Sequence, residues 1–242
     1  FLPESKCMVH TGTSTTHSRY ISTFREAATL PALHAYLQHK HQWTKDTLDD
    51  IQWQWFRQAV RSYKHSSANH LTKLVYNQLA TPDRKTKTGG QTWHDPICPH
   101  CHLQPETFDH LLRCNEPDAI TFRMKLIPSV IALCTKYRVP APFQSTLTST
   151  IEEWMSDQPP RNADTNNIPL TRLFTSQNSI GRNNLMRGFL SIEWSQYLTT
   201  TINDQPMRCT HHTFFAHLIT TLWSAQTDFW TSYQLRRHTP PD

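Results

Sequence analysis

The stretch of this sequence with the clearest chemistry is CPHCHLQPETFDHLLRC, residues 98–114, which holds three of the chain's six cysteines. Two cysteines three positions apart can bind one ion when the chain turns between them, and Pro99 favours such a turn. A histidine and a cysteine four positions apart share one face of a helix. The candidate ligands, in the pattern C-x2-C-x8-H-x3-C, are Cys98, Cys101, His110 and Cys114. Three thiolates and one imidazole form the closed tetrahedral set of a structural site, so we predict one structural zinc ion in a CCHC-type knuckle.

Other residues near this stretch offer alternative ligands. His100 and His102 could each supply the imidazole, but neither is followed by a cysteine four positions further along, as His110 is. A chance C-x2-C is the alternative in a chain with six cysteines, and the added histidine and cysteine at helical spacing argue against it. Cys7, Cys134 and Cys209 stand alone, which fits a reducing intracellular compartment, nucleus or cytoplasm, rather than a disulfide scaffold.

The composition predicts a packed, mainly helical protein. Eight Trp and eleven Phe in 242 residues indicate a core, because such side chains are costly to leave in water. Five Gly against sixteen Pro favour helices joined by proline-containing loops. No apolar run approaches the roughly 18 residues that a membrane span needs, so we expect no membrane partner. The net charge of +5 permits an anionic partner without requiring one.

The periodicity of apolar residues predicts the elements that must position the cluster. Segments with a helical period are residues 24–37, 43–63, 67–80, 115–139, 144–157, 180–198 and 211–237. Pro31 is expected to restart the first of these helices and Pro128 to kink or split the fourth. The last has an apolar arc wide enough for two neighbours. Residues 81–96 read as a loop, and no segment shows the alternation of a strand.

We therefore predict a mainly α fold, a helical bundle with an inserted zinc knuckle. Residues 1–157 would form a helical region carrying the knuckle at 98–114, and residues 170–238 a C-terminal helical pair packed on it. Residues 158–169, QPPRNADTNNIP, would be the linker between them.

The cysteine-containing stretch resembles the zinc-binding segment that follows the polymerase region in reverse transcriptases of non-LTR retroelements. That segment reads CPxC, a short gap, Glu-Thr, then His and Cys. The matching residues are Cys98, Pro99, Cys101, Glu106, Thr107, His110 and Cys114. The helix with Lys73 and Leu74, and residues 177–194, also resemble C-terminal regions of reverse-transcriptase-like proteins of diatoms and related algae, with Arg182 where those often have Trp. The resemblance covers about residues 45–200 and implies a C-terminal module of such a protein.

Catalytic motifs do not accompany the resemblance. The only Asp-Asp pair, in LDDI at residues 48–51, lacks the aromatic residue of a polymerase motif and reads as a solvated first helical turn. Pro117 and Asp118 form a pair of a kind found in nucleases, but the pair opens a helix instead of lying beside a strand. No Gly-rich phosphate loop, HExxH or GxSxG occurs. We expect no catalytic activity in this chain.

Cations and an aromatic residue near the cluster suggest RNA or DNA as a partner. Cations meet phosphates and release counterions, and an aromatic ring can stack on an unpaired base. The candidate residues are Arg84, Lys85, Lys87, Trp93, His100 and Arg113. The alternative is a structural or protein-interaction domain in which zinc only holds a loop, Trp93 packs under the zinc site and the aromatic helices contact the polymerase part of a larger polypeptide.

Overall fold

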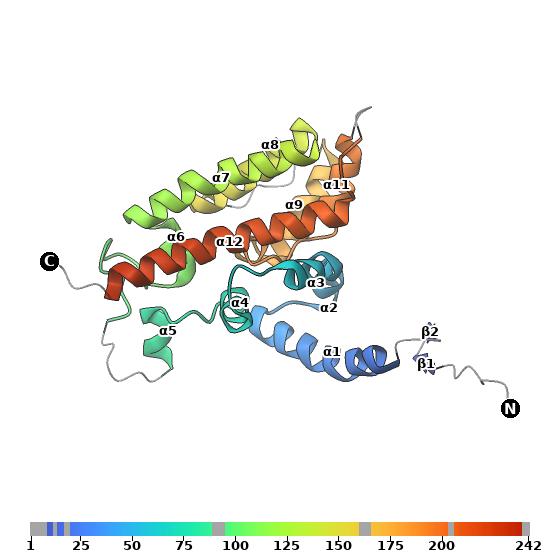
Figure 1. The fold of residues 1–242 in the computed structure, drawn as a ribbon, viewed down its shortest axis with the longest axis horizontal. Coiled ribbons are helices and arrows are strands. Elements are labelled where there is room, and N and C mark those ends of the chain that lie inside the picture. The colour runs from blue at the N-terminus through green and yellow to red at the C-terminus, as the bar shows by residue number, and fades with distance from the viewer. Residues whose placement is uncertain are drawn as a thin grey trace. The chain divides into compact units, whose positions relative to one another are not determined.

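The computed structural model describes residues 9–11, 14–16, 20–88, 95–159, 166–202 and 206–238. These residues are mainly helical, which confirms the predicted fold class at that level (Figure 1). The elements in chain order are β1 (Val9–Thr11), β2 (Ser14–Thr16), α1 (Tyr20–His41), α2 (Lys45–Asp50), α3 (Trp53–Ser62), α4 (Ala68–Val75), α5 (Pro82–Lys87), α6 (Phe108–Arg113), α7 (Pro117–Tyr137), α8 (Ala141–Met155), α9 (Ile168–Ile180), α10 (Arg182–Met186), α11 (Glu193–Thr201) and α12 (His211–His238).

The chain divides into two compact units, Phe1–Asp49 and Asp50–Asp242. The first unit contains the antiparallel pair β1–β2, which the sequence did not predict, and α1. Helix α1 continues through Pro31, so the predicted restart there is wrong. The proposed linker at 158–169 stays a prediction, and residues 160–165 of it lie outside the described residues.

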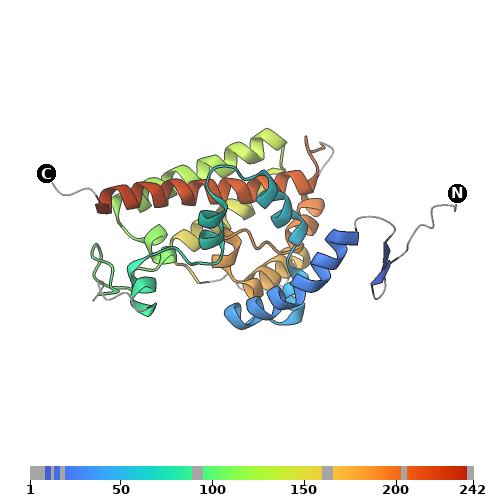
Figure 2. The same ribbon diagram turned by 60° about the horizontal axis from the view of Figure 1, so that its bottom comes forward.

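Helix α12 organises the second unit because its apolar arc packs on both α7 and α3. It lies beside α7 in both ribbon views (Figures 1 and 2). On the other side, the ring of Trp55 on α3 stacks on Phe215 with centroids 3.9 Å apart. Phe214 and Trp223 of α12 are completely buried. The two neighbours predicted from the wide apolar arc are therefore present.

Helix α7 leads directly out of the cysteine-containing segment. Glu116 caps it by accepting a hydrogen bond from the backbone N–H of Ala119 at 3.1 Å, and Pro117 occupies the first turn. Of the two outcomes predicted at Pro128, a kink or a split, the split is wrong because the helix continues to Tyr137, and the kink stays a prediction. Pro128 is exposed, while Leu126 and Val130 on either side of it are completely buried. Burial of that inner face compensates for the hydrogen bond that proline removes.

Two predicted helices are interrupted, and the interruptions contact each other. Residues 43–63 form α2 and α3 rather than one helix, and residues 180–198 form α10 and α11. Between them, the N–H of Gln52 donates to the carbonyl of Leu190 at 2.9 Å, and the N–H of Ile192 donates to that of Asp50 at 2.8 Å. These hydrogen bonds between distant backbone groups replace the hydrogen bonds of a continuous helix, and the local period of apolar residues cannot predict them.

Tight packing fixes the second interruption at Gly188. Its φ is +91°, and a Cβ built there would lie 2.8 Å from Ile219 Cγ2 and 2.9 Å from Trp223 on α12. Only glycine has both the backbone freedom and the missing side chain that this close approach needs.

The segment predicted as a loop at 81–96 begins with helix α5, so that prediction is wrong for residues 82–87. Thr81 caps the helix by accepting from the N–H of Arg84 at 3.4 Å, and Pro82 occupies its first turn. Helix α9, which the sequence did not predict, starts at the cap residue Asn167 in the same way.

Candidate metal centre

A tight loop places the first two cysteines. Ile97 and Pro105 form an antiparallel bridge, and the N–H of Cys98 donates to the carbonyl of Gln104 at 2.8 Å. Inside this loop the N–H of His102 donates to the carbonyl of Cys98 at 2.9 Å, with His102 in the left-handed region at φ 55°. The chain thus turns back within seven residues and brings Cys98 and Cys101 to the same side.

The short helix α6 places the other two candidate ligands. Thr107 caps it by accepting from the N–H of His110 at 3.1 Å. Cys114 follows the last helical residue, and its N–H donates to the carbonyl of His110 at 2.8 Å, which keeps the two side chains one turn apart on one face. The helical spacing predicted from the sequence is therefore the spacing observed.

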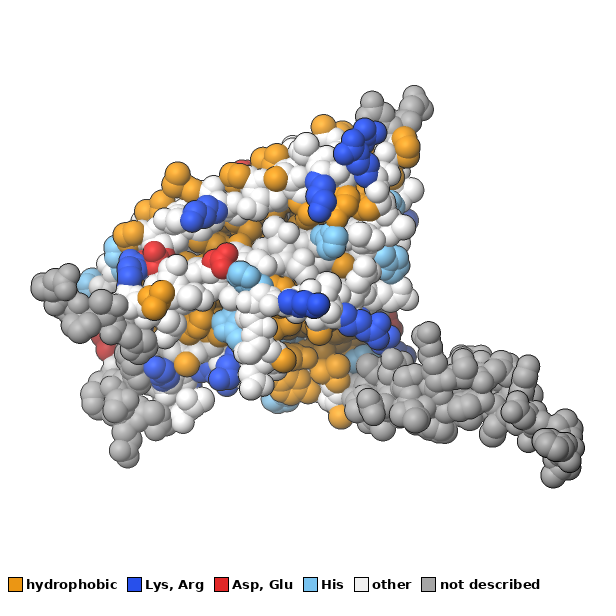
Figure 3. Space-filling model, viewed as in Figure 1, with side chains coloured by type: hydrophobic (Ala, Val, Ile, Leu, Met, Phe, Trp, Pro, Cys, Tyr) orange, Lys and Arg blue, Asp and Glu red, His pale blue; other side chains and the backbone are white. Residues whose placement is uncertain are grey.

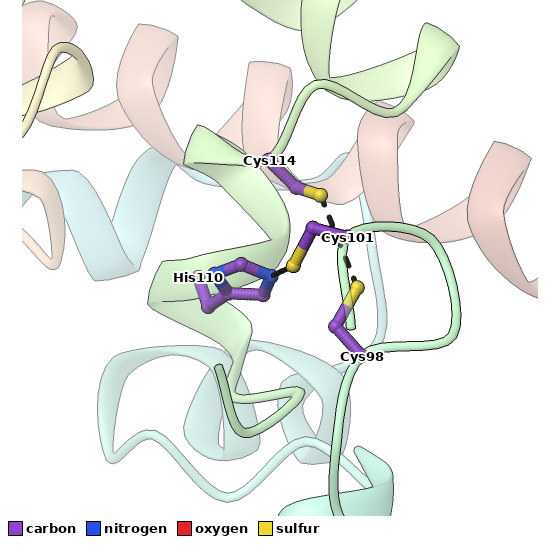
Figure 4. Close-up of side chains that lie close together, drawn as sticks. All are labelled: Cys98, Cys101, His110 and Cys114. Carbon is purple, nitrogen blue, oxygen red and sulfur yellow. Dashed lines mark hydrogen bonds between the residues drawn. The ribbon is translucent and has the colours of Figure 1, made fainter. Parts of the chain in front are cut away.

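The four side chains converge on one point (Figure 4). One ligand atom from each of Cys98, Cys101, His110 and Cys114 lies within 4.8 Å of all the others. The Sγ atoms of Cys98 and Cys114 are 3.9 Å apart, and Cys101 Sγ is 3.4 Å from His110 Nε2. Tetrahedral bonds of the lengths that zinc makes to sulfur and nitrogen imply separations of about 3.5–3.8 Å. The cluster can hold a metal ion, and it uses His110 rather than His100 or His102.

Burial sets the protonation of the candidate ligands. Burial, together with the neighbouring Cys98, raises the pKa of the Cys114 thiol to about 12. Burial acts the same way on Cys101, but hydrogen bonds from the backbone of Leu103 and Gln104 and from Cys98 and Cys114 together outweigh it, so the pKa of Cys101 is lowered. Burial also lowers the pKa of His110, which favours the neutral imidazole that a metal requires.

Neighbouring side chains orient and balance the cluster. The Nδ1 atom of His110 lies 3.1 Å from Gln104 Oε1, so a proton on Nδ1 is accepted there and Nε2 presents its lone pair to the cysteines. Arg123 of α7 donates through Nη1 to the carbonyls of Leu112 and Cys114 at 3.1 and 2.9 Å. Burial lowers the pKa of Arg123, whereas the thiolate form of Cys114 raises it. Arg123 therefore places a positive charge beside Cys114, which would favour its thiolate form when a metal binds.

The C-terminal end of α12 anchors the cluster to the helical core. Glu106, only 2% exposed, accepts hydrogen bonds from the Tyr233 hydroxyl and from Arg237 Nη1, the latter at 3.0 and 3.1 Å to its two oxygens. The adjacent Arg236 pairs with Glu116 and Asp118 at the start of α7. Two neighbouring arginines of α12 thus hold the cysteine-containing segment, one within it at Glu106 and one just after it at Glu116 and Asp118.

Metal affinity is expected to fall steeply with falling pH. At neutral pH the Cys114 thiol, with its pKa near 12, is protonated in the free protein and must lose its proton to bind metal. For each proton released on binding, the apparent dissociation constant rises about tenfold for every unit by which the pH falls. A shift from about pH 7 to about pH 6 should therefore raise it at least about tenfold. Competition with a chromophoric chelator, corrected for the chelator's own protonation, measures this slope. A zero slope would contradict thiolate ligation.

The residues predicted to contact nucleic acid differ in their exposure to solvent. Trp93 lies outside the described residues. His100 is exposed on the cysteine loop, and Arg84 and Lys85 on α5 are half-buried. Lys87 on the same helix is exposed and pairs with Asp83 at 2.9 Å. Figure 3 shows one face of the molecule, on which Lys and Arg side chains are spread out and not gathered into one patch.

Arg113 has internal partners. Its Nη1 donates to Asp157 and its Nη2 to Asn183, both at 2.5 Å, and its guanidinium lies over the Trp154 ring at 4.6 Å from the centroid. The side chain joins α6 to the end of α8 and to α10. This arrangement supports a positioning role for Arg113, and its predicted contact with nucleic acid is untested.

Sequence reasoning missed the residues that surround the cluster. Glu106 was identified only as part of the matching pattern, and its burial under Tyr233 and Arg237 depends on a contact across more than 120 residues of chain. The charged Arg123, Arg236 and Arg237 carry no local signal that distinguishes them from solvated helix residues. Asp118, considered above for a nuclease, pairs with Arg236 at the start of a helix.

Comparison of the chain with family models, with curated proteins and with solved structures gives no match. Among the described residues, no helix is long and apolar enough to cross a membrane.

Proposed function

We propose that this chain is a zinc-stabilised module that binds RNA or DNA as the C-terminal part of a reverse-transcriptase-like retroelement protein. The observation that carries the proposal is the convergence of four ligand atoms within 4.8 Å from a segment whose sequence resembles the zinc-binding segment of those proteins. Three sulfurs and one imidazole match structural zinc better than magnesium or calcium, which prefer oxygen ligands. The ion would close the knuckle, with no position left for a reacting water.

Helix α5 supports the nucleic-acid part of the proposal. Its first turn is held by the buried residues Thr81 and Asp83, so Arg84, Lys85 and Lys87 extend from a fixed helix rather than a free loop. A preorganised set of cations loses less entropy when it meets phosphates.

Replacing Arg84, Lys85 and Lys87 together with Gln is expected to weaken binding of a single-stranded oligonucleotide and to flatten its salt dependence. For single strands, three lost phosphate contacts reduce the slope of log K against log salt by about 2. Fluorescence anisotropy over a salt series measures both effects. The matched control replaces the exposed Lys125, Lys136 and Arg172 with Gln, the same change of charge. Equal losses in both variants would contradict a nucleic-acid interface on α5.

A structural role is the second candidate, and the partners of Arg113 favour it. Its guanidinium is held by Asp157, Asn183 and Trp154, so the cation predicted to meet phosphates instead links helices. In this alternative zinc only fixes the segment between α5 and α7 against α12. The salt series separates the two roles, because a purely structural domain shows no binding of the oligonucleotide at low salt.

A further inference from the structure

The metal centre adjoins a polar pocket of about 630 Å³ in the second unit. Its walls come from the cysteine loop, from α6 and the start of α7, and from the residues that follow α8 and begin α10. The volume lies within the range of pockets that hold a small organic ligand, about 300–1,000 Å³. What could occupy it depends on the charges and hydrogen-bonding groups of the walls.

The positive and negative charges around the pocket cancel, so the pocket carries no net charge. Asp109 is paired with Arg187 at 2.5 Å, and Asp157 with Arg113 at 2.5 Å. No carboxylate pairs with Arg123 among the described residues; its Nη1 donates to two carbonyls beside Cys114. A zinc ion with three thiolates and a neutral imidazole carries one net negative charge, which Arg123 offsets. A pocket that is neutral in sum does not favour a free anion such as inorganic phosphate.

The pocket walls contain both hydrogen-bond donors and hydrogen-bond acceptors that make no contact within the described residues. Gln104 uses only its oxygen, towards His110, so its amide N–H groups have no partner in the described part of the chain. The oxygen of Asn183 accepts from both Arg113 and Trp154, at 2.5 and 2.6 Å, which leaves its amide donors open as well. Asp157 binds Arg113 through one oxygen, and its second oxygen remains an acceptor. The walls therefore offer donors and an acceptor to one ligand.

Apolar groups and rigid supports complete the pocket. Leu103, 82% exposed, and Met155, 7% exposed, both line it. The guanidinium of Arg113 is fixed by two hydrogen bonds and by the Trp154 ring, so this wall is ordered before any ligand arrives. A planar group with apolar faces and a mixed donor–acceptor edge fits these walls.

We propose that this pocket binds the base of an unpaired nucleotide in a single-stranded nucleic acid. The inference rests on the proposed function and deepens it, since it assigns base contacts to a site separate from the cations of α5. A paired base cannot enter, because its edge is occupied and its faces are stacked, whereas an unpaired base exposes both. The donors of Gln104 and Asn183 meet carbonyl oxygens of the base, and Asp157 accepts from its amino or imino group.

The test compares two single-stranded oligonucleotides of equal length and charge, one with bases and one abasic, on the zinc-loaded full chain. The intact strand is expected to bind about tenfold more tightly or better, because a base contact on a single strand is a substantial part of its affinity. Ser156, an exposed residue that lines the pocket, is replaced with Leu to fill it without changing charge. The control is Ser145→Leu at an exposed position near the other end of α8.

The pocket assignment predicts that Ser156→Leu removes the preference for the intact strand while Ser145→Leu keeps it, with zinc content equal in both variants. Equal affinity of the wild-type chain for both strands overturns the pocket but leaves the proposed function standing, since phosphate contacts then suffice. If Ser156→Leu still prefers the intact strand to the abasic strand, the pocket assignment is also overturned. Failure of the wild-type chain to bind either strand at low salt removes the proposed function as well. Inorganic phosphate is expected not to compete at concentrations that leave ionic strength unchanged.

Discussion

Replacing Cys114 with Ser is expected to abolish zinc binding and to unfold residues 95–116 while α3, α7 and α12 keep their packing. Structural zinc contributes about 10–16 kcal/mol of apparent binding free energy at neutral pH, which matches or exceeds the stability of a typical domain. Cys114 is 4% exposed and ends α6, so its loss removes both a ligand and the contact between the helix and the loop. Phe215 stacks on Trp55 of α3 and Phe214 contacts Tyr137 of α7, and these contacts, which involve no residue of 95–116, should keep those helices folded.

Hydrogen exchange with and without the substitution measures the expected local unfolding, and native mass spectrometry measures the zinc. The matched control is Cys209→Ser, since Cys209 is a partly exposed free cysteine outside the cluster. We expect one zinc per chain in the wild type and in the control, and none in Cys114→Ser. If Cys114→Ser keeps its zinc and the protection of α6, the ligand assignment is wrong.

Replacing Arg237 with Met is expected to destabilise the protein by about 3–5 kcal/mol, because it leaves the carboxylate of Glu106 buried without its charged partner. Glu106 is 2% exposed, and Arg237 donates to both of its oxygens. The Tyr233 hydroxyl also donates to this carboxylate, and burial raises the pKa of Tyr233, so it stays a donor throughout the neutral range. The stability should be lost because the cysteine-containing segment is held less firmly against α12.

Denaturant unfolding of Glu106→Gln, Arg237→Met and the double variant measures the coupling between the two residues. The double variant should be more stable than the sum of the single losses predicts, because it has no buried unpaired charge. Arg172→Met on α9 removes an exposed arginine and should change stability by less than about 0.5 kcal/mol. Additive losses would show that Glu106 and Arg237 act independently and would contradict this anchor.

The candidate cluster of three cysteines and one histidine was predictable from the sequence because local geometry determines most of it. A turn between Cys98 and Cys101 and one helical turn between His110 and Cys114 need no distant contact, and both are present. The long helices α7 and α12 were predictable for the same reason, since their apolar residues recur at the helical period. Pro128 is an exception: its local preference predicted a kink or a split, but α7 continues through it because tertiary burial of the inner face outweighs that preference.

What the sequence could not reveal depends on contacts between distant segments. The break between α2 and α3, and the residues just before α11, are held by backbone bonds between residues 50–52 and 190–192, and these bonds leave no periodic signal. The partners of Glu106 and Arg113 lie far along the chain, on α12 and beyond the end of α8. Charged residues at exposed helical spacing read as solvated, although here they hold the cysteine-containing segment in place.

X-ray absorption at the zinc edge, on the full chain purified without chelator, tests the metal centre most directly. Tetrahedral coordination by Cys98, Cys101, His110 and Cys114 predicts one zinc per chain, with three sulfur atoms at about 2.3 Å and one nitrogen at about 2.0–2.1 Å. A chain that contains no zinc, or a zinc shell made mainly of oxygen atoms, would contradict the account.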